Sequence, residues 1–307
     1  MFRQCIFLFL ILLLGLPYVL ASQAIKTFKI EDFGLKGNVK SCLVITDYGK
    51  EEYHFDTIGR LTKSITRFND FDYETTYYKF QNNELIEKRV ENYFDNTFDK
   101  STSIANFYKF DSLTNRKVTE KIVSYTKQLL EQNVYSYNEE GQLINLTRTD
   151  TDGTDETLIA YDTIDGKQIM TQTINGRPLE VVKTWNEAAA DGSENLLKST
   201  IKYFDAKLNT KSVEMFNTSQ MLVSRNDFLY DGSTEKWIPQ EAIIYSYDNG
   251  ILSKKTTQKQ NLTVTKNYIY QFDGTTFNNW VKEIITPDNT YKTRKINYYP
   301  LPETMEQ

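Results

Sequence analysis

Hydrophobic and polar residues alternate along much of this chain. Residues 76–80 read Thr-Tyr-Tyr-Lys-Phe, and residues 243–247 and 268–272 also place aromatic side chains two positions apart. Alternation with a period of two, rich in Tyr, Phe, Ile, Val and Thr, is typical of β-strands. Only residues 186–197, which hold three consecutive alanines, are considered as a short helix or a loose insert.

An aromatic pair followed by an acid or amide recurs roughly every 25 residues, which predicts one supersecondary unit copied many times. The copies are Tyr53-x-Phe55-Asp56, Tyr78-x-Phe80-Gln81, Tyr108-x-Phe110-Asp111, Tyr135-x-Tyr137-Asn138, Tyr161-Asp162, Tyr203-Phe204-Asp205, Leu229-Tyr230-Asp231, Tyr245-x-Tyr247-Asp248 and Tyr270-x-Phe272-Asp273.

A turn follows each aromatic anchor. In the clearest copy, Asp56 is expected to accept hydrogen bonds from the turn backbone, Gly59 to take a positive φ, and Leu61 to return to the core. Residues 137–143 repeat this pattern. The unit is therefore a β-hairpin, and the predicted fold is all-β: about ten hairpins of roughly 25 residues forming an elongated, twisted or curled antiparallel sheet.

Residues 55–62, Phe-Asp-Thr-Ile-Gly-Arg-Leu-Thr, resemble the YD repeat of the RHS-repeat family. Residues 137–143 match well but carry Gln142 where the pattern has Arg, and the other copies match by spacing and aromatics only. Asp273-Gly274, followed by residues 279–282, looks like a variant from exported repeat proteins of Bacteroidetes. The resemblance implies an antiparallel β array over roughly residues 34–299, without the toxin-enclosing shell of the full-length family.

The N-terminus has the features of a signal peptide. Arg3 precedes an unbroken apolar run over residues 6–14, and Val19-x-Ala21 offers a cleavage site. A retained anchor is the alternative, but the run is shorter than the about 20 residues of a membrane span. The predicted organisation is a signal peptide over 1–21, a loosely held leader over 22–35, a β-repeat domain over 36–299 with the insert 186–197, and a tail over 300–307.

Composition excludes several functions. The formal net charge is −5, with acids and bases interspersed, which argues against nucleic acid because its binding needs a basic stripe. The two cysteines are Cys5, inside the predicted signal, and Cys42. The exported chain then has no partner for a disulfide, and Cys42 is interpreted as a small apolar strand residue, against the alternative of a reactive thiol.

Candidate chemistry is sparse, and no catalytic residue, metal site or cofactor is predicted. His54 is the only histidine, so a base with an orienting partner or a multi-histidine metal site is not expected. Residues 150–156 loosely resemble a calcium loop, with weaker echoes at residues 69–72 and 95–99. Acidic turn residues explain all three without a metal.

The predicted function is therefore a non-catalytic, exported envelope or surface module. Its binding residues are unknown, and its partner would be a protein or a glycan. Trp185, Trp237 and Trp280 are interpreted as part of the repeat core, with a surface that stacks on sugar rings as the alternative. The expected location is the periplasm, the cell surface or the exterior, with no transmembrane span in the mature chain.

Two alternatives remain. A glycan-active enzyme would need paired carboxylates in a cleft, which sequence cannot place. An outer-membrane β-barrel would need an apolar outward band. Strands such as residues 62–67 and 253–259 contain Lys63, Lys254 and Lys255, and these side chains argue against contact with lipid.

Overall fold

The structure is a computed structural model that describes residues 25–111, 116–189 and 192–300. Twenty strands follow one short 3₁₀ helix, η1 (Ile30–Phe33). The strands are β1 (Val39–Thr46), β2 (Gly49–Phe55), β3 (Leu61–Arg67), β4 (Tyr73–Gln81), β5 (Glu84–Phe94), β6 (Thr97–Asp111), β7 (Lys117–Ser124), β8 (Leu129–Tyr137), β9 (Leu143–Thr149), β10 (Thr154–Ile164), β11 (Lys167–Ile174), β12 (Arg177–Ala188), β13 (Glu194–Phe204), β14 (Lys207–Phe216), β15 (Leu222–Asp231), β16 (Lys236–Asp248), β17 (Ile251–Lys259), β18 (Leu262–Phe272), β19 (Trp280–Thr286) and β20 (Thr290–Tyr298).

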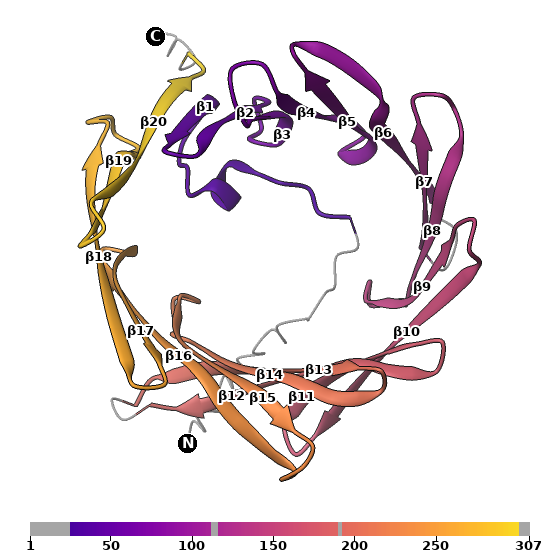
Figure 1. The fold of residues 1–307 in the computed structure, drawn as a ribbon, viewed down its shortest axis with the longest axis vertical. Helices are drawn as coiled ribbons and strands as arrows, with labels where there is room; N and C mark the ends of the chain where they lie inside the picture. Colours follow the sequence, from indigo (N-terminus) through magenta and orange to yellow (C-terminus); the bar gives the residue numbers. More distant parts are fainter. Residues whose placement is uncertain (1–24, 112–115, 190–191, 301–307) are drawn as a thin grey trace, which may run out of the picture.

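The strands form one closed barrel. Each strand pairs antiparallel with the next along the chain, and β1 also pairs with β20, where Cys42 lies opposite Ile296. Figure 1 accordingly shows a ring, viewed along its axis. We call the space inside the ring the lumen. Closure gives each of the described strands two neighbours, which removes the usual site of edge-to-edge aggregation.

Closure corrects the predicted arrangement. The all-β class and the hairpin unit agree with the structure, but the elongated or curled open sheet is wrong, because the first and last strands pair with each other. For the same reason, the description as an open YD-type or RHS-type repeat protein is overturned. A closed barrel is the architecture of the outer-membrane alternative, which the fold supports over an open repeat module.

The predicted turn chemistry is confirmed at the two best sequence matches. Asp56 Oδ1 accepts hydrogen bonds from the backbone N–H groups of Ile58 and Arg60. Gly59 adopts a φ of 80°, and Leu61 is 3% exposed. In the second copy, Asn138 Oδ1 accepts from the N–H of Gln142. The side chain and the glycine together fix the chain reversal, so local sequence specifies these turns.

Replacing Gly141 by Ala is expected to lower the free energy of unfolding by about 1–2 kcal/mol, since an L side chain is strained in the left-handed region. Gly141 has a φ of 77°, and an added Cβ would meet nothing within 4 Å, so the cost is purely conformational. Urea unfolding measures it. Gly141→Asn should lose less, because Asn tolerates this region.

The matched control is Gly232→Ala, which has the same open surroundings without a left-handed φ. Equal losses at Gly141 and Gly232 would contradict the conformational explanation.

Residues 25–38 form a segment that we call the inner strap. It runs inside the ring from the start of β1 towards the wall at β7–β9 (Figure 1), where Ile25 packs against the cluster that holds Val118 and Tyr137. Ile30 and Leu35 are buried in a core with Phe55 and Leu61. The strap also adds backbone bonds to the wall, because the N–H of Leu61 donates to the carbonyl of Phe28 at 2.9 Å. The strap is therefore part of the core.

Two residues near the closure seam hold the inner strap. Asn279 accepts a hydrogen bond from the N–H of Lys36 and donates one to its carbonyl, both at 2.8 Å. Arg294 of β20 donates to the carbonyl of Phe33 at 2.8 Å and lies 3.4 Å from the ring centroid of Trp280. The strap thus ties together elements that lie far apart in sequence.

Two further sequence predictions need correction. The leader over 22–35 was expected to be loosely held, but its described part, from residue 25, packs in the core. In the insert over 186–197, residues 186–188 instead belong to β12 and residues 194–197 to β13, while residues 190 and 191 lie outside the described part of the chain. The predicted signal peptide and residues 301–307 of the tail lie outside the described residues. No helix in the part of the chain described is long and apolar enough to cross a bilayer.

Candidate functional site: the inner face of the barrel

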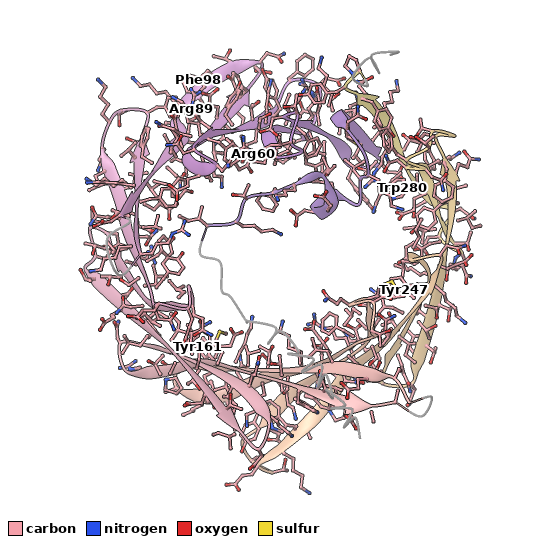
Figure 2. All side chains as sticks on the ribbon, turned by 180° about the vertical axis from the view of Figure 1, so that it is seen from behind. Arg60, Arg89, Phe98, Tyr161, Tyr247 and Trp280 are labelled. Atoms are coloured by element: carbon pink, nitrogen blue, oxygen red, sulfur yellow. The ribbon has the colours of Figure 1, made fainter. Side chains whose placement is uncertain are left out.

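Alternation along each strand assigns side chains to the inner or the outer face. Cys42 and Phe55 contact the inner strap, so they mark the inner face of β1 and β2. Figure 2 places Tyr161, Tyr247 and Trp280 on the inner side of the strands and Phe98 on the outer side. Directly paired residues of neighbouring strands lie on the same face of a sheet. The register of pairing therefore assigns the inner and outer positions of each further strand.

A concavity of about 730 Å³ on the inner face lies over β11–β16. We call it the inner groove. Its floor is made by small side chains, since Thr200 of β13 lies opposite Val182 on one side and Ser212 on the other. Met170 adds an apolar side chain next to Val182. The groove therefore combines hydroxyl groups with a short apolar strip.

Charged rows stand on both sides of this floor. On one side Lys202 lies opposite Glu180, with 4.0 Å between Nζ and Oε1. On the other side Glu214 lies between Lys198 at 3.5 Å and Arg225 at 3.6 Å. Each contact joins directly opposed residues of neighbouring strands, where opposite charges attract.

The charged side chains that alternation turns into the inner groove balance. They are three bases and three acids, namely Lys198, Lys202, Arg225, Glu180, Glu214 and Asp227. A fourth base at the groove, Lys211, alternates to the outer face, where its ammonium lies 5.6 Å from the ring centroid of Phe228. Arg225 also donates to both oxygens of Asp227, at 3.0 and 2.9 Å. A site with compensated charge gives little electrostatic preference for a ligand of either sign.

A second polar cluster of the inner face surrounds a carboxylate whose hydrogen bonds are satisfied. Glu120 of β7 is 7% exposed and accepts from Asn106 at 2.8 Å, Asn133 at 3.2 Å and Tyr135 at 2.7 Å. A buried carboxylate that receives several hydrogen bonds is stable as an ion and fixes its neighbours. This cluster is therefore explained by the architecture of the wall.

The single histidine and the single described cysteine lie on opposite faces. His54 pairs outward with Glu52, with 2.7 Å between Nε2 and Oε1. Cys42 is 1% exposed and unpaired in the core beneath the inner strap. Its position agrees with the predicted apolar packing role. Neither residue has the other within reach, so no nucleophile and base are brought together here.

The predicted acidic clusters are divided among separate partners. Asp150 pairs with Arg148 at 3.1 Å, whereas Asp155 accepts from Asn175 and Glu156 accepts from Asn145, both at 2.7 Å. Among the described residues, no group of three or more His, Cys, Asp or Glu side chains is arranged to hold a metal ion.

The two weaker clusters cap turns and join neighbouring hairpins. Asn69 Oδ1 accepts from the backbone N–H groups of Phe71 and Asp72. Asp72 Oδ1 accepts from the N–H of Asp95 in the next hairpin. The Asn69 amide also donates to Asp72 Oδ2, at 2.8 Å. The hydrogen bonds from the Asn69 amide and then from the Asp95 backbone hold the pKa of the Asp72 carboxyl below its ordinary value. Both clusters are thus structural.

The three tryptophans do not form one surface. Trp280 lies on the inner face over Arg294. Trp185 lies outward by alternation on β12, with the Lys167 ammonium 4.6 Å from its ring centroid. Trp237 packs against Tyr230, with ring centroids 5.1 Å apart. The alternative of a single tryptophan surface for stacking on sugars is therefore not supported.

Sequence reasoning missed the inner groove. In residues 197–202 the positions of Lys198, Thr200 and Lys202 share one face, and the apolar Leu197 and Ile201 share the other. Charges spread through strands look like a solvated surface when each strand is considered alone. The acids that complement these bases, Glu180 on β12 and Glu214 on β14, are recognised only when the neighbouring strands are aligned in register. Aligning the predicted hairpins strand by strand could therefore have revealed the groove.

No protein-family model matches the sequence, and a search of the curated proteins found no relative. The resemblance to the YD repeat is therefore untested by any family model. Among solved structures, the chain is similar to two crystal structures of porin-like proteins. That from Bacteroides uniformis ATCC 8492 has 10% identity and a TM-score of 0.28, over 84% of this chain and 98% of that chain. That from Bacteroides vulgatus ATCC 8482 has 8% identity and a TM-score of 0.24, over 86% and 99%.

A third similarity is to the crystal structure of TcdB2-TccC3, with 10% identity and a TM-score of 0.30. It covers 72% of this chain and 15% of that chain. TM-scores this low carry no argument, so the conclusions below rest on the barrel itself.

Proposed function

We propose that this protein is an outer-membrane β-barrel that acts through its lumen and not as an enzyme. The observation that carries the proposal is the closure of 20 antiparallel strands into one barrel. Inside a bilayer every backbone N–H and C=O must be paired within the protein, and a closed barrel is one of only two architectures that achieve this. The predicted signal peptide supports export.

The outer face of the second half of the barrel supports contact with lipid. Along β12–β19 its outward positions are rich in aliphatic side chains, including Val181, Ile201, Val213, Ile244, Ile269 and Ile284. Ile244 and Ile269 are exposed. An outward apolar band that alternates with a polar inner face is the pattern of transmembrane barrels.

The lysines that argued against a barrel divide between the two faces. On β17, Lys255 lies opposite Tyr245 on the inner face, whereas its neighbour Lys254 points outward. Only about half of the charges in such a strand would therefore meet lipid. The sequence-based objection is weaker than it appeared from Lys content alone.

One observation favours a second candidate, a ring that works in an aqueous compartment of the envelope. The outer face of β3–β7 carries Lys63, Arg89 and Lys121 in the middle of strands. Figure 2 places Arg89 on the outside. Each exposed cation at the bilayer midplane costs about 2–4 kcal/mol. Ion pairing of Arg89 with Glu87, at 2.9 Å, offsets part of that cost.

Reconstitution into planar lipid bilayers tests the proposal. A lumen open to solutes is expected to give stepwise conductance, and the protein should remain with membranes after carbonate extraction. Quantitative release into the aqueous fraction, together with a silent bilayer, would reject the membrane assignment and leave the aqueous ring.

Two adjacent threonines of β17 supply a matched pair for the same measurement. Thr257 lies opposite Ile243 on the inner face, and Thr256 lies opposite Ile244 on the outer face. We expect a charged thiol reagent to lower the conductance of Thr257→Cys and to leave that of Thr256→Cys unchanged. Cys42 is buried, so the introduced thiol is the reactive one. Equal responses of the two variants would contradict a path through the lumen.

A further inference from the structure

We propose that the inner groove binds a neutral, hydroxyl-rich chain, that is, an uncharged oligosaccharide. This inference rests on the proposed function in taking the lumen as the working surface, and it names the class of solute. It is carried by the balance of charge in the groove, by the geometry of its ion pairs and by its floor.

The ion pairs leave hydrogen-bonding capacity free. Lys202 and Glu180 are 4.0 Å apart, and the Lys202 side chain is 65% exposed. Pairs of this kind contribute roughly 0–1 kcal/mol, so a ligand can insert between them at little cost. A hydroxyl group suits the gap because it donates to the carboxylate and accepts from the ammonium at the same time. An anion or a cation would satisfy only one of the two partners.

The floor fits the same ligand. Thr200 and Ser212 are small and each offers one hydroxyl, so the groove is deepest between its charged rows. Met170 and Val182 lie beside them, and the small part of each that reaches the groove, 7% and 4% of the residue, is apolar. Binding sites commonly combine an apolar surface with a few placed polar groups in this way.

The direction of the inner groove indicates an extended ligand. A row of paired lining residues crosses β11–β14 at right angles to the strands, and three interstrand spacings of about 4.8 Å span about 14 Å. Equivalent polar groups recur at each strand along this path, in the order Gln172, Glu180, Lys202, Thr210. A chain of linked rings can therefore repeat one mode of contact from strand to strand.

Isothermal titration calorimetry of the exported protein tests the inference. The probes are maltohexaose, cellohexaose and laminarihexaose as neutral chains and hexagalacturonate as an anionic chain. At least one neutral chain should bind, and hexagalacturonate should bind more weakly. Binding of hexagalacturonate alone, or of no chain at millimolar concentration, would overturn the inference.

Two variants distinguish a neutral ligand from a charged one. Glu214→Gln and Lys198→Gln should each weaken binding of the neutral chain about tenfold, because each removes one charge-assisted hydrogen bond. An anionic ligand would instead bind Glu214→Gln more tightly. Lys183→Gln is the control, since Lys183 lies outward on β12. Should Glu214→Gln fail to fold, Glu180→Gln provides the same measurement.

Unchanged affinity in both groove variants would also overturn the inference, because the sugar would then bind elsewhere. The two experiments distinguish a failure of the sugar-binding inference from a failure of the proposed membrane function. Bilayer conductance without sugar binding rejects only the groove as a sugar site. Sugar binding by a protein that gives no conductance rejects the transmembrane role and retains the groove.

Discussion

Phe55→Ala is expected to lower the free energy of unfolding by about 3–5 kcal/mol, the cost of deleting a fully buried aromatic side chain. Phe55 is 2% exposed and lies against Leu61 and the inner strap. Its ring contacts Phe33 of the strap, with centroids 5.4 Å apart. The loss has two sources, because the variant leaves a cavity and also removes a contact that holds the strap. Urea unfolding followed by tryptophan fluorescence measures it.

The control is Phe204→Ala. Phe204 occupies the corresponding position of another aromatic anchor but is 73% exposed. Its loss should therefore stay within about 0.5 kcal/mol, as for other surface substitutions. Similar losses in the two variants would contradict the assignment of Phe55 to the core.

Asn279→Ala should be the second most damaging change, with a loss of about 1–3 kcal/mol. The side chain is 2% exposed and satisfies both backbone groups of Lys36, and it also donates to the hydroxyl of Tyr298 at 2.8 Å. Alanine removes the partners of the two part-buried backbone groups of Lys36, whereas the Tyr298 hydroxyl keeps its bond to Asp273. Leaving such groups unpaired costs more than the hydrogen bonds themselves contribute. Limited proteolysis should then cut the inner strap earlier than in the parent protein.

Asn297→Ala separates loss of the strap contact from loss of any asparagine. Asn297 lies on the outer face of β20 and donates one exposed hydrogen bond to Ser41 Oγ, at 3.0 Å. We expect wild-type stability and an uncut strap. Protease resistance of the Asn279→Ala strap, despite lower stability, would show that Asn279 does not hold the strap.

The sequence predicted local structure well, because the relevant interactions lie within a few residues. The turn at Asp56 and Gly59 is specified by a side chain that caps the backbone four residues on and by one glycine. Alternation of Tyr and Thr predicted the strands. Aromatic anchors are less informative about burial, since Phe55 is buried, whereas Phe272, at 39% exposed, is not.

Closure and the inner groove could not be predicted, because both depend on residues far apart. Cys42 meets Ile296 only if the small curvature at every hairpin sums to a full turn, and no local pattern fixes that sum. The inner strap was missed for the same reason, since Lys36 finds its partner Asn279 243 residues away. The groove requires the register of several strands before its acids and bases face each other.

The pairing of β1 with β20 has a consequence for chain order. Val39, at the start of β1, lies opposite Tyr298, at the end of β20, so a short peptide could connect the two terminal strands. The barrel could then be opened at any of its hairpin turns without changing a single strand pair. Circular permutation would preserve every strand pair of the wall. Only the inner strap, which leads into β1 from inside the ring, distinguishes β1 from the other strands as the first of the barrel.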